Sequence, residues 1–377
     1  MKILYIAPFD MAANSGGGIA CRSYYNAVKA LYPDSTDLMM FEEDCRGEYA
    51  DAIRIPARKG LQYLTDPGMH RGNKFIKQFL RENGDQYDIC VANCSRYCGD
   101  LIDDFHKYGI KVITIHHNYE VEYCMDNKSM FTLKGLFSGL IKWIEGNAYR
   151  KSDVNCFLTK NDQDKISKEY GYTNAYNYLL GVFEPAPQIL KSSKTVNNDT
   201  LVFTGSMCDY QTYHSVEIFE RDFLDTFMKK FPTLKLLIAG RNPHESVYKL
   251  QKKYPKVISV VANPVNMNDV IDRASVFFCP TCIGSGLKLR LMDGLKKGLP
   301  VLVHCVSARG YDSFFGNPFF QIYETPETFE KGLNTILEFI KDNRNYQDEI
   351  IRIYADNFSF ESGVNRFSEV IKLIKSN

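Results

Sequence analysis

Residues 280–304, PTCIGSGLKLRLMDGLKKGLPVLVH, decide the fold of this chain. The apolar run Val276–Phe278 leads into the stretch, and a second apolar run, Val301–Val303, closes it. Between the two runs lie a glycine turn at 284–286, a basic, leucine-rich segment that ends at Asp293, and a second glycine at Gly298. Strand, glycine turn, helix, short loop and strand, in that order, are typical of a parallel βαβ unit. The stretch therefore predicts a parallel sheet with charged side chains just past a glycine turn.

Apolar runs of this kind recur along the whole chain with helical segments between them. The runs are continuous rather than alternating, which favours strands that are covered on both faces. They are Ile3–Ala7, Ile89–Ala92, Val112–Ile115, Val154–Leu158, Leu201–Phe203, Leu234–Ala239 and Val257–Val261, besides the two already named. Among the helices between them, one is expected to be capped at 266–269 and to run through Ala274. The fold class predicted is α/β throughout, with parallel sheets.

One segment breaks this alternation and predicts a domain boundary. Residues 184–200, EPAPQILKSSKTVNNDT, are rich in Pro, Ser, Asn and Lys, which is the composition of a linker. We therefore expect two Rossmann-like domains facing across a cleft, an N-terminal one over 1–184 and a C-terminal one over 201–357, joined at 185–200. A last helix at about 358–377 is expected to pack back on the N-terminal domain.

The bulk composition limits the classes of function. A chain of 377 residues with a net charge of +1 is long enough for two cores and gives no sign of a nucleic-acid-binding surface. The start, MKILYIAPFD, resembles a first strand and not a signal peptide, and no apolar run approaches the roughly 18 residues of a membrane span. The cysteine count of 11 is odd, which favours reduced thiols and a cytoplasmic location.

Metal binding is not expected from the cysteines. Cys279 and Cys282 form a CxxC pair, but a zinc ribbon needs a second such pair. The other close pair, Cys94 and Cys98, has the wrong spacing and lies in the other half of the chain.

Polar and glycine-rich residues gather directly after the predicted strands. Open α/β sheets bind ligands at the carboxyl ends of their strands, so this distribution points to a ligand site. The segments concerned are 14–18, 116–118, 205–206, 240–241 and 284–288.

The charged residues after the glycine turn suit a nucleotide. Gly284 and Gly286 let backbone N–H groups approach an anion, and Lys288 and Arg290 add positive charge suited to phosphate. Asp293 is a poor phosphate ligand but a good acceptor for sugar hydroxyls. The alternative is that the glycines only form a turn and that the cations belong to a solvated helix face.

Three further segments leave alternatives open. In 116–120, HHNYE, neighbours on an extended chain point to opposite faces, so hydrogen bonding to a polar substrate is favoured over a shared metal. The loop at 14–18, NSGGG, is not a GxGxxG motif but can bring backbone close to a ligand or simply be flexible, with a helix expected from near Ala20. The segment 130–143, MFTLKGLFSGLIKW, favours a core-facing helix over one that rests on a membrane surface.

With these motifs in order, the chain resembles the retaining glycosyltransferases of family four, the group one transferases, which have the GT-B fold. The C-terminal half carries most of the resemblance, through LVFTGSM, PTLKLLIAGRNP and the stretch quoted above. The N-terminal half contributes KILYIAP, the Gly-Gly loop, VITIHHNYEVEY and DVNCFLTKNDQDKISKEYG.

The resemblance implies roles for individual residues. Asp293 stands where the family has a glutamate that binds the donor ribose, and Ser285 stands where many members have a second glutamate. Many members also hold the diphosphate with Arg and Lys after the first strand of the C-terminal domain, but GSMCDYQTYHS has neither. We therefore expect Lys288 or Arg290 to take that role. The candidate catalytic residues are His116, His117, Lys288 and Arg290, and the candidate donor-binding residues are Gly17, Gly18, Gly205, Ser206, Arg241, Val265, Gly284, Ser285, Gly286, Leu287, Lys288 and Asp293.

The expected function is that of a metal-independent hexosyltransferase without a cofactor, using a nucleoside-diphosphate sugar as donor. The resemblance implies retention of anomeric configuration, a glycan or lipid-linked acceptor, and a part in cell-surface polysaccharide synthesis. It implies a cytoplasmic protein, with peripheral membrane contact through the N-terminal domain as an option, and no nucleic-acid partner. Two alternatives remain: a non-hydrolysing sugar-nucleotide epimerase of the same fold, and an inactive nucleotide-sugar-binding protein.

Overall fold

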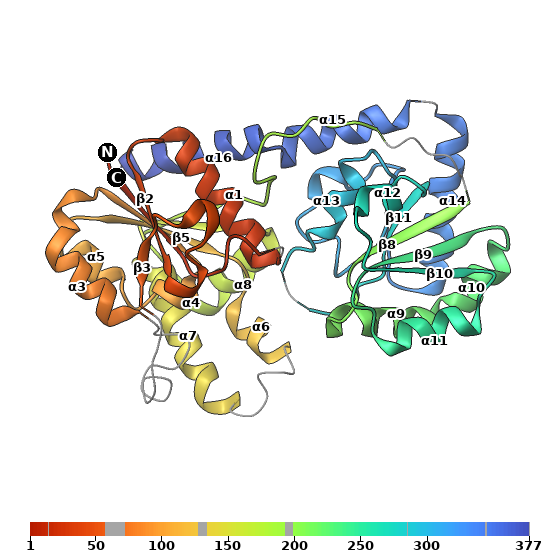
Figure 1. Cartoon of the computed structure of the whole chain (residues 1–377), viewed down its shortest axis with the longest axis horizontal. Coiled ribbons are helices and arrows are strands. Elements are labelled where there is room, and N and C mark those ends of the chain that lie inside the picture. Colours follow the sequence, from red (N-terminus) through yellow and green to blue (C-terminus); the bar gives the residue numbers. More distant parts are fainter. Residues whose placement is uncertain are drawn as a thin grey trace. The chain divides into compact units, whose positions relative to one another are not determined.

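The computed structural model describes the chain except for Asn14, residues 57–71, 127–133 and 193–198, Ser285, Arg344 and Asn377. It divides into two compact units (Figure 1). Unit 1 comprises Met1–Gln188 together with Ser359–Asn377, and unit 2 comprises Ile189–Phe358.

Unit 1 is built on a seven-stranded parallel sheet with the order β3-β2-β1-β4-β5-β6-β7. Its strands are β1 (Ile3–Ala7), β2 (Thr36–Phe41), β3 (Ile53–Ile55), β4 (Ile89–Asn93), β5 (Lys111–His116), β6 (Val154–Phe157) and β7 (Tyr176–Leu179). Its helices are α1 (Gly16–Leu31), α3 (Asn73–Asn83), α4 (Ser95–Cys98), α5 (Ile102–His106), α6 (Glu120–Asp126), α7 (Lys134–Lys151), α8 (Lys160–Tyr170) and α16 (Phe360–Ser376). Three single-turn 3-10 helices, η1 (Glu42–Asp44), η2 (Gly47–Tyr49) and η3 (Gly84–Gln86), lie in the connections.

Helices cover both faces of this sheet, as continuous apolar strands require. Leu4 and Ile6 of β1 pack in one core with residues of α3 and α5, while Tyr5 between them points to the other face and bonds to α1. On that other face α16 lies along α1 (Figure 1). The last helix of the chain thus completes the first unit, and it is tied there by Arg366, which donates to the carbonyl of Val182 at 3.3 Å.

Unit 2 has a six-stranded parallel sheet with the order β10-β9-β8-β11-β12-β13. Its strands are β8 (Thr200–Ser206), β9 (Lys235–Arg241), β10 (Ile258–Ala262), β11 (Val276–Cys279), β12 (Val301–His304) and β13 (Phe320–Tyr323). Its helices are α9 (Tyr210–Asp222), α10 (Leu224–Lys230), α11 (Glu245–Lys253), α12 (Met267–Ile271), α13 (Arg290–Leu295), α14 (Pro326–Asp342) and α15 (Tyr346–Phe358), with one 3-10 turn, η5 (Asp312–Phe314).

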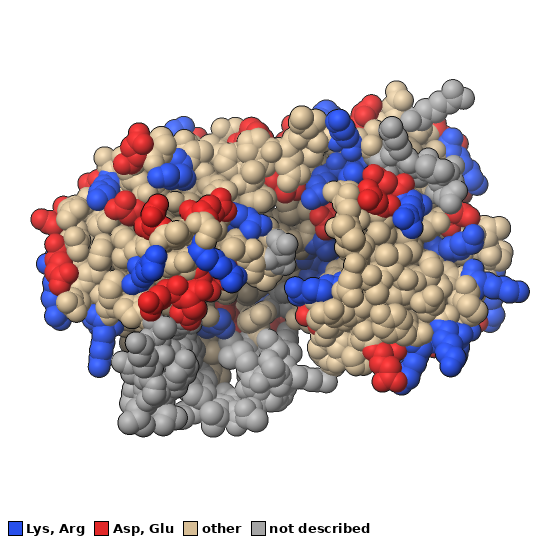
Figure 2. Space-filling model, in the orientation of Figure 1, with Lys and Arg blue, Asp and Glu red and all other residues tan. Residues whose placement is uncertain are grey.

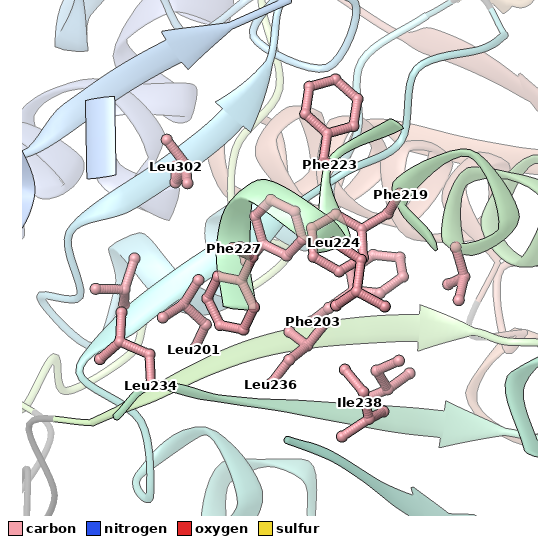
Figure 3. Packing of buried hydrophobic residues seen from close by; sticks show 14 of the residues in the cluster. Leu201, Phe203, Phe219, Phe223, Leu224, Phe227, Leu234, Leu236, Ile238 and Leu302 are labelled. Atoms are coloured by element: carbon pink, nitrogen blue, oxygen red, sulfur yellow. The ribbon is translucent and has the colours of Figure 1, made fainter. Parts of the chain in front are cut away.

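The core of unit 2 is rich in aromatic side chains. Figure 3 shows Phe203 of β8 and Leu236 of β9 meeting Phe219 of α9 and Phe227 of α10. The ring of Phe219 lies edge-on to that of Phe278, with the centroids 5.1 Å apart. Full burial of one such side chain contributes roughly 1.5–3 kcal/mol, so this layer is a main source of the stability of the unit and holds the carboxyl ends of β8 and β11 in place.

Several predicted boundaries differ from the observed ones. The helix expected through Ala274 ends at Ile271, although Asn266 does cap it by accepting from the backbone N–H of Asn268. The first helix begins at Gly16, not near Ala20, because the Ser15 hydroxyl accepts from the N–H of Gly18 and caps it.

Charged side chains on one face of the molecule and the apolar character of the described helices bear on the expected partners. On the face shown in Figure 2, acidic and basic side chains are interspersed, in keeping with the net charge of +1. In the described part of the chain, no helix has both the length and the apolar character needed to cross a bilayer. The expected helix over 130–143 begins outside the described residues; in α7, Ile141 and Ile144 are buried and Trp143 is 51% exposed.

Candidate functional site

Each sheet has one point where the strand order reverses, and the residues predicted to bind a ligand lie around these two points. The reversal falls between β1 and β4 in unit 1 and between β8 and β11 in unit 2. In open α/β sheets such a switch point leaves a crevice outside the carboxyl ends of the strands. The two points are described in turn.

In unit 2, Arg290 bridges the two strands of the switch point. It is the first residue of α13, and its guanidinium lies against Gly205 at the end of β8: a Cβ on Gly205 would stand 2.8 Å from Nη1. The φ of Gly205 is 156°, so a side chain is excluded there both by this contact and by the backbone. Ser206, the next residue, ends β8 and is half-buried.

The partners of Arg290 are neutral. Nη2 donates to the Thr212 hydroxyl at 2.9 Å and Nη1 to the Thr281 hydroxyl at 3.4 Å, and both threonines are fully buried. The guanidinium also lies over the ring of Phe203 at 5.5 Å. Within the described residues Arg290 forms no ion pair, so these contacts fix its position without cancelling its charge.

Lys288 lies in the loop ahead of α13, not on the helix as expected. Its side chain is only 8% exposed, and Nζ donates to Oε1 of Gln211 at 3.3 Å. The backbone carbonyl of Lys288 accepts from the Tyr311 hydroxyl at 2.9 Å, which anchors the loop. The two cations therefore point from different elements, Lys288 toward the first turn of α9 at Gln211 and Arg290 toward β8.

The glycine turn is shaped by the same glutamine. Gly284 has φ 91°, and a Cβ there would overlap the amide group of Gln211. Gly286, with φ 73°, is buried and Leu287 is half-buried. Ser285 lies outside the described residues. The turn does not lead straight into a helix, because α13 begins only at Arg290. The expected approach of an anion to a helix end directly after the glycines is therefore not what the structure has.

Asp293 and two other candidates lie further out. Asp293 falls in the first turn of α13; its side chain is 39% exposed and pairs with Lys296 at 3.0 Å. Arg241, at the end of β9, and Val265, in the loop after β10, are both exposed.

Two functional candidates escaped sequence reasoning. Gln211 and Thr212 stand in the segment noted for its lack of Arg and Lys, and it is their neutral oxygens that receive the two cations. Their only sequence signal is their position, just after the first strand of the unit.

In unit 1 the loop after β1 brings its glycines close to other backbone. Gly17 lies against the ring of Phe9, 3.1 Å from where its Cβ would be, and Gly18 lies against the carbonyl of Asp10. Both belong to the first turn of α1, while Asn14 lies outside the described residues. The glycines therefore allow close packing within this loop. The approach of its backbone to a ligand stays a prediction.

The two histidines point to opposite sides, as adjacent residues at a strand end should. His116 is fully buried; Nε2 hydrogen-bonds with Oδ1 of Asn155 at 3.1 Å and the ring stacks on Phe157 with centroids 5.0 Å apart. Burial lowers the pKa of His116 from 6.5 to about 4. This side chain faces the interior between β5 and α7.

His117 faces the switch point between β1 and β4. Its Nε2 bonds to Asn93 at the end of β4, and its ring centroid lies 5.4 Å from that of Phe9 in the loop after β1. Burial, with smaller contributions from His116 and Arg96, lowers its pKa from 6.5 to about 3. Of the two candidates, only His117 therefore lies at the switch point.

A buried acidic network stands behind His117. Glu120 is 2% exposed and pairs with Arg96 at 3.4 Å, and its backbone N–H donates to Glu145 at 3.0 Å. Burial, together with the neighbouring Glu120, raises the pKa of Glu145 from 4.5 to about 8. Over the residues that the structure describes, no three His, Cys, Asp or Glu side chains are grouped so as to hold a metal ion.

Comparison with protein families identifies the second unit. Residues 198–355 match the family model described as Glycosyl transferases group 1. The match spans nearly all of unit 2, which contains the switch point that Lys288 and Arg290 occupy. No curated protein sequence matches the chain.

Solved structures share the fold over the full chain. HepE from Anabaena, crystallised in complex with UDP, has a TM-score of 0.72 and 11% identity over 99% of this chain and 100% of that one. The lipopolysaccharide outer core galactosyltransferase WaaB has a TM-score of 0.68 and 12% identity, over 98% of this chain and 99% of that one. Sucrose-phosphate synthase from Thermosynechococcus elongatus has a TM-score of 0.66 and 13% identity, over 100% of this chain and 99% of that one. These likenesses confirm the predicted fold, two α/β domains with parallel sheets of the GT-B type.

Proposed function

We propose that the chain is a glycosyltransferase that moves a hexose from a nucleoside-diphosphate sugar to a glycan or lipid-linked acceptor, with retention of configuration. The observation that carries the proposal is the pair of cations at the switch point of a group 1 glycosyltransferase domain. Arg290 is held there by two threonine hydroxyls and Lys288 by a glutamine amide oxygen. The guanidinium and the ammonium group supply positive charge for an anionic group such as a diphosphate.

In this proposal the two cations have different roles. Lys288 comes from the loop and contacts the diphosphate, whose negative charge grows as the glycosidic bond breaks; a cation there stabilises the transition state more than the ground state. Arg290 is fixed against Gly205 and holds the start of α13 beside the end of β8. Asp293 accepts hydrogen bonds from the ribose hydroxyls in place of its bond with Lys296.

The comparisons support a uridine nucleotide as the first donor to test. HepE has been crystallised with UDP and with UDP-glucose, and WaaB is named a galactosyltransferase. For this chain we propose a UDP-hexose donor, no cofactor and no metal, with catalysis depending on positioning and on charge stabilisation of the leaving diphosphate. We also propose a part in cell-surface polysaccharide synthesis at the cytoplasmic face of the membrane.

One experiment separates this function from its alternatives. The purified chain is incubated with UDP-, GDP- and ADP-hexoses, with and without glycan acceptors, and nucleotide release and product anomers are followed by NMR. Release of nucleoside diphosphate together with an acceptor product of unchanged anomeric configuration supports the proposal. Interconversion of the sugar without an acceptor indicates an epimerase, binding without turnover indicates an inactive binding protein, and absence of binding to every donor overturns the proposal.

A further inference from the structure

The edge strand β7 of unit 1 lacks the residues that usually protect the edge of a sheet. An edge strand presents unpaired N–H and C=O groups, and proteins commonly shield them with charged side chains and proline. Residues 171–183, GYTNAYNYLLGVF, contain β7 and have neither a charge nor a proline. The other three edge strands have both, inside the strand or within two positions of its ends: Arg54 and Pro56 at β3, Lys256 and Pro264 at β10, and Pro318 and Glu324 at β13.

The open backbone groups of β7 belong to Asn177 and Leu179. In the described part of the chain, β6 is the one strand that pairs with β7. The backbone N–H groups of Tyr176 and Leu180 donate toward β6, at 3.1 and 2.9 Å, so residues 176, 178 and 180 direct their backbone groups to that side. Successive residues of a strand direct these groups to opposite edges, so Asn177 and Leu179 direct theirs outward.

Large apolar side chains surround this open edge. Tyr172, just before the strand, is 83% exposed, Tyr176 is 40% exposed and Leu179 is 45% exposed. Asn177 directs its side chain inward, where Nδ2 donates to the hydroxyl of Tyr149 on α7 at 3.3 Å. The edge therefore combines unpaired backbone groups with exposed apolar surface, which is what a second strand would cover.

The spacing of the two outward residues suits a second copy of the same strand. In an antiparallel pair, opposite residues whose backbone groups face each other exchange two hydrogen bonds. If Asn177 of one copy lies opposite Leu179 of the other, two-fold symmetry places Leu179 of the first opposite Asn177 of the second. All the outward N–H and C=O groups of these residues are then paired, and the two-fold axis passes beside Tyr178.

The same register brings compatible side chains together. Side chains alternate along a strand, so Tyr176 and Tyr178 lie on one face and Asn177 and Leu179 on the other. Tyr178 lies opposite its own copy at the axis, with Tyr176 of each copy next to it, and cross-strand aromatic pairs of this kind stabilise sheets. Because residues 171–183 carry no charge, two copies of the segment meet without like-charge repulsion.

We propose that β7 pairs antiparallel with β7 of a second copy of this chain, which joins two seven-stranded sheets across a two-fold axis at Tyr178. A strand of four residues gives an interface at or below the low end of the about 1,200–2,000 Å² that stable complexes bury. The dimer should therefore dissociate on dilution. It is independent of the proposed function, because no part of the candidate donor site takes part in it.

Sedimentation velocity of the full-length chain tests the dimer. The wild-type chain should show a monomer–dimer equilibrium that shifts to monomer on dilution. Leu179→Lys places a charge beside Asn177 of the second copy and keeps the hydrogen bonds from β7 to β6, so it should raise the dissociation constant at least tenfold. The matched control is Ile322→Lys on the edge strand β13, which replaces an apolar side chain of similar exposure and should dimerise like wild type. Circular dichroism checks that both variants fold.

Cysteine crosslinking tests the register. The Cα atoms of opposite residues that do not exchange hydrogen bonds are about 4.5 Å apart in an antiparallel pair, which is within the range for a disulfide. Tyr178→Cys should therefore crosslink to its own copy under mild oxidation and give a covalent dimer on a non-reducing gel. Leu179→Cys lies opposite Asn177 instead, so it should give no more crosslinked dimer than the wild-type chain.

Each contrary result overturns the proposal. A wild-type chain that remains monomeric at every concentration would leave the edge of β7 to a strand of a different protein. A dimer that Leu179→Lys does not weaken would be held by another surface. If Leu179→Lys failed to fold, the absence of a Tyr178→Cys crosslink would overturn the pairing in its place. None of these measurements uses a sugar nucleotide, so failure of the proposed function would leave their results unchanged.

Discussion

Arg290 and Gly205 are in contact although 85 positions separate them in the sequence: the guanidinium occupies the space that a Cβ on Gly205 would need, with Nη1 2.8 Å from that point. The contact follows from the parallel pairing of β8 with β11, which brings the end of one strand beside the loop that leaves the other. Arg290 is therefore a part of the framework of the switch point, while Lys288 comes from the loop next to it and is itself buried.

We predict unequal effects of removing the two cations. Lys288→Ala should lower the turnover number at least about a hundredfold, in the range seen when one electrostatic donor is lost, with little change in Tm. Arg290→Ala should lower the Tm as well, because the buried Thr212 and Thr281 hydroxyls lose a charged hydrogen-bond donor. Steady-state kinetics and thermal unfolding of both variants check this.

The matched control is Lys256→Ala, which removes a lysine from the same unit after α11 and away from β8 and β11. It should leave turnover and Tm as they are. Wild-type turnover in Lys288→Ala, Arg290→Ala and the double variant would show that the diphosphate is held by other groups.

The pairing of Gly284 with Gln211 gives a second prediction. Gly284→Ala places a methyl group on the Gln211 amide and should displace it from Lys288, lowering both stability and turnover. Gln211→Ala removes the overlap, so the loss from Gly284→Ala should be smaller in that background. The strain of φ 91° remains in both backgrounds, and a double-mutant cycle on Tm and turnover isolates the steric part. Additive effects would contradict the assigned contact.

The fold could be predicted in outline because the interior strands are covered on both faces. Their continuous apolar runs stand out in the sequence, as in β1, β5 and β8. Of the four edge strands, β10 also stands out, but β3, β7 and β13 do not, since an edge strand has one neighbour and more solvent. In β7, YNYL, three of four residues are exposed, which leaves no apolar run to detect.

The candidate site could be predicted in part. Lys288 and Arg290 could be predicted because they are charged, and Gly205 and Gly284 because they are glycines that follow predicted strands. Gln211 and Asn93 could not be found in this way because neutral side chains acquire their roles only through the partners that folding brings to them. The sequence also offered no means of choosing between His116 and His117, since the choice depends on which face of β5 is enclosed.

The third prediction concerns Asp293. If its carboxylate accepts from the ribose hydroxyls, Asp293→Ala removes charge-assisted hydrogen bonds worth roughly 1.5–3 kcal/mol, and the Kd for nucleotide should rise about ten- to a hundredfold. Lys296→Ala removes the partner that Asp293 has in the structure and keeps the carboxylate, so it serves as the control and should bind as well as wild type. Calorimetric titration with UDP measures both, and an unchanged Kd for Asp293→Ala would remove the ribose assignment.

The fourth prediction concerns metal ions. In the proposed mechanism the cationic side chain of Lys288 offsets the negative charge of the diphosphate, so turnover should survive excess chelator. Initial rates with and without EDTA, followed by addition of Mg²⁺ or Mn²⁺, test this. Loss of turnover in EDTA that either ion restores would contradict the metal-independent mechanism.

The last prediction is a pH dependence of stability that originates at Glu145. Its carboxyl is buried on α7, where Oε2 accepts from the Tyr170 hydroxyl at 2.8 Å, and its pKa is about 8 against an ordinary 4.5. Glu120 and Asp162 are the other acids that face it, and both raise its pKa. Between pH 4.5 and pH 8 the folded chain therefore keeps the Glu145 proton, which the unfolded chain has already released.

The sign of the effect follows from this proton. Where the folded state binds more protons than the unfolded state, the free energy of unfolding falls as the pH rises, by up to about 1.4 kcal/mol per pH unit for one group. The buried histidines act in the opposite direction but only below their unfolded pKa of 6.5. Between pH 6.5 and pH 8 the carboxyl effect should therefore dominate, and unit 1 should lose stability as the pH rises.

Glu145→Gln keeps the shape of the protonated side chain and cannot ionise, so its unfolding free energy should be flatter over this pH range and should exceed that of wild type near pH 8. The single tryptophan, Trp143, lies on the same helix, and its fluorescence in a urea titration reports this unit specifically. Glu369→Gln, at an exposed position on α16 of the same unit, should keep the wild-type slope. Parallel slopes for wild type and Glu145→Gln would show that Glu145 is ionised in the folded chain.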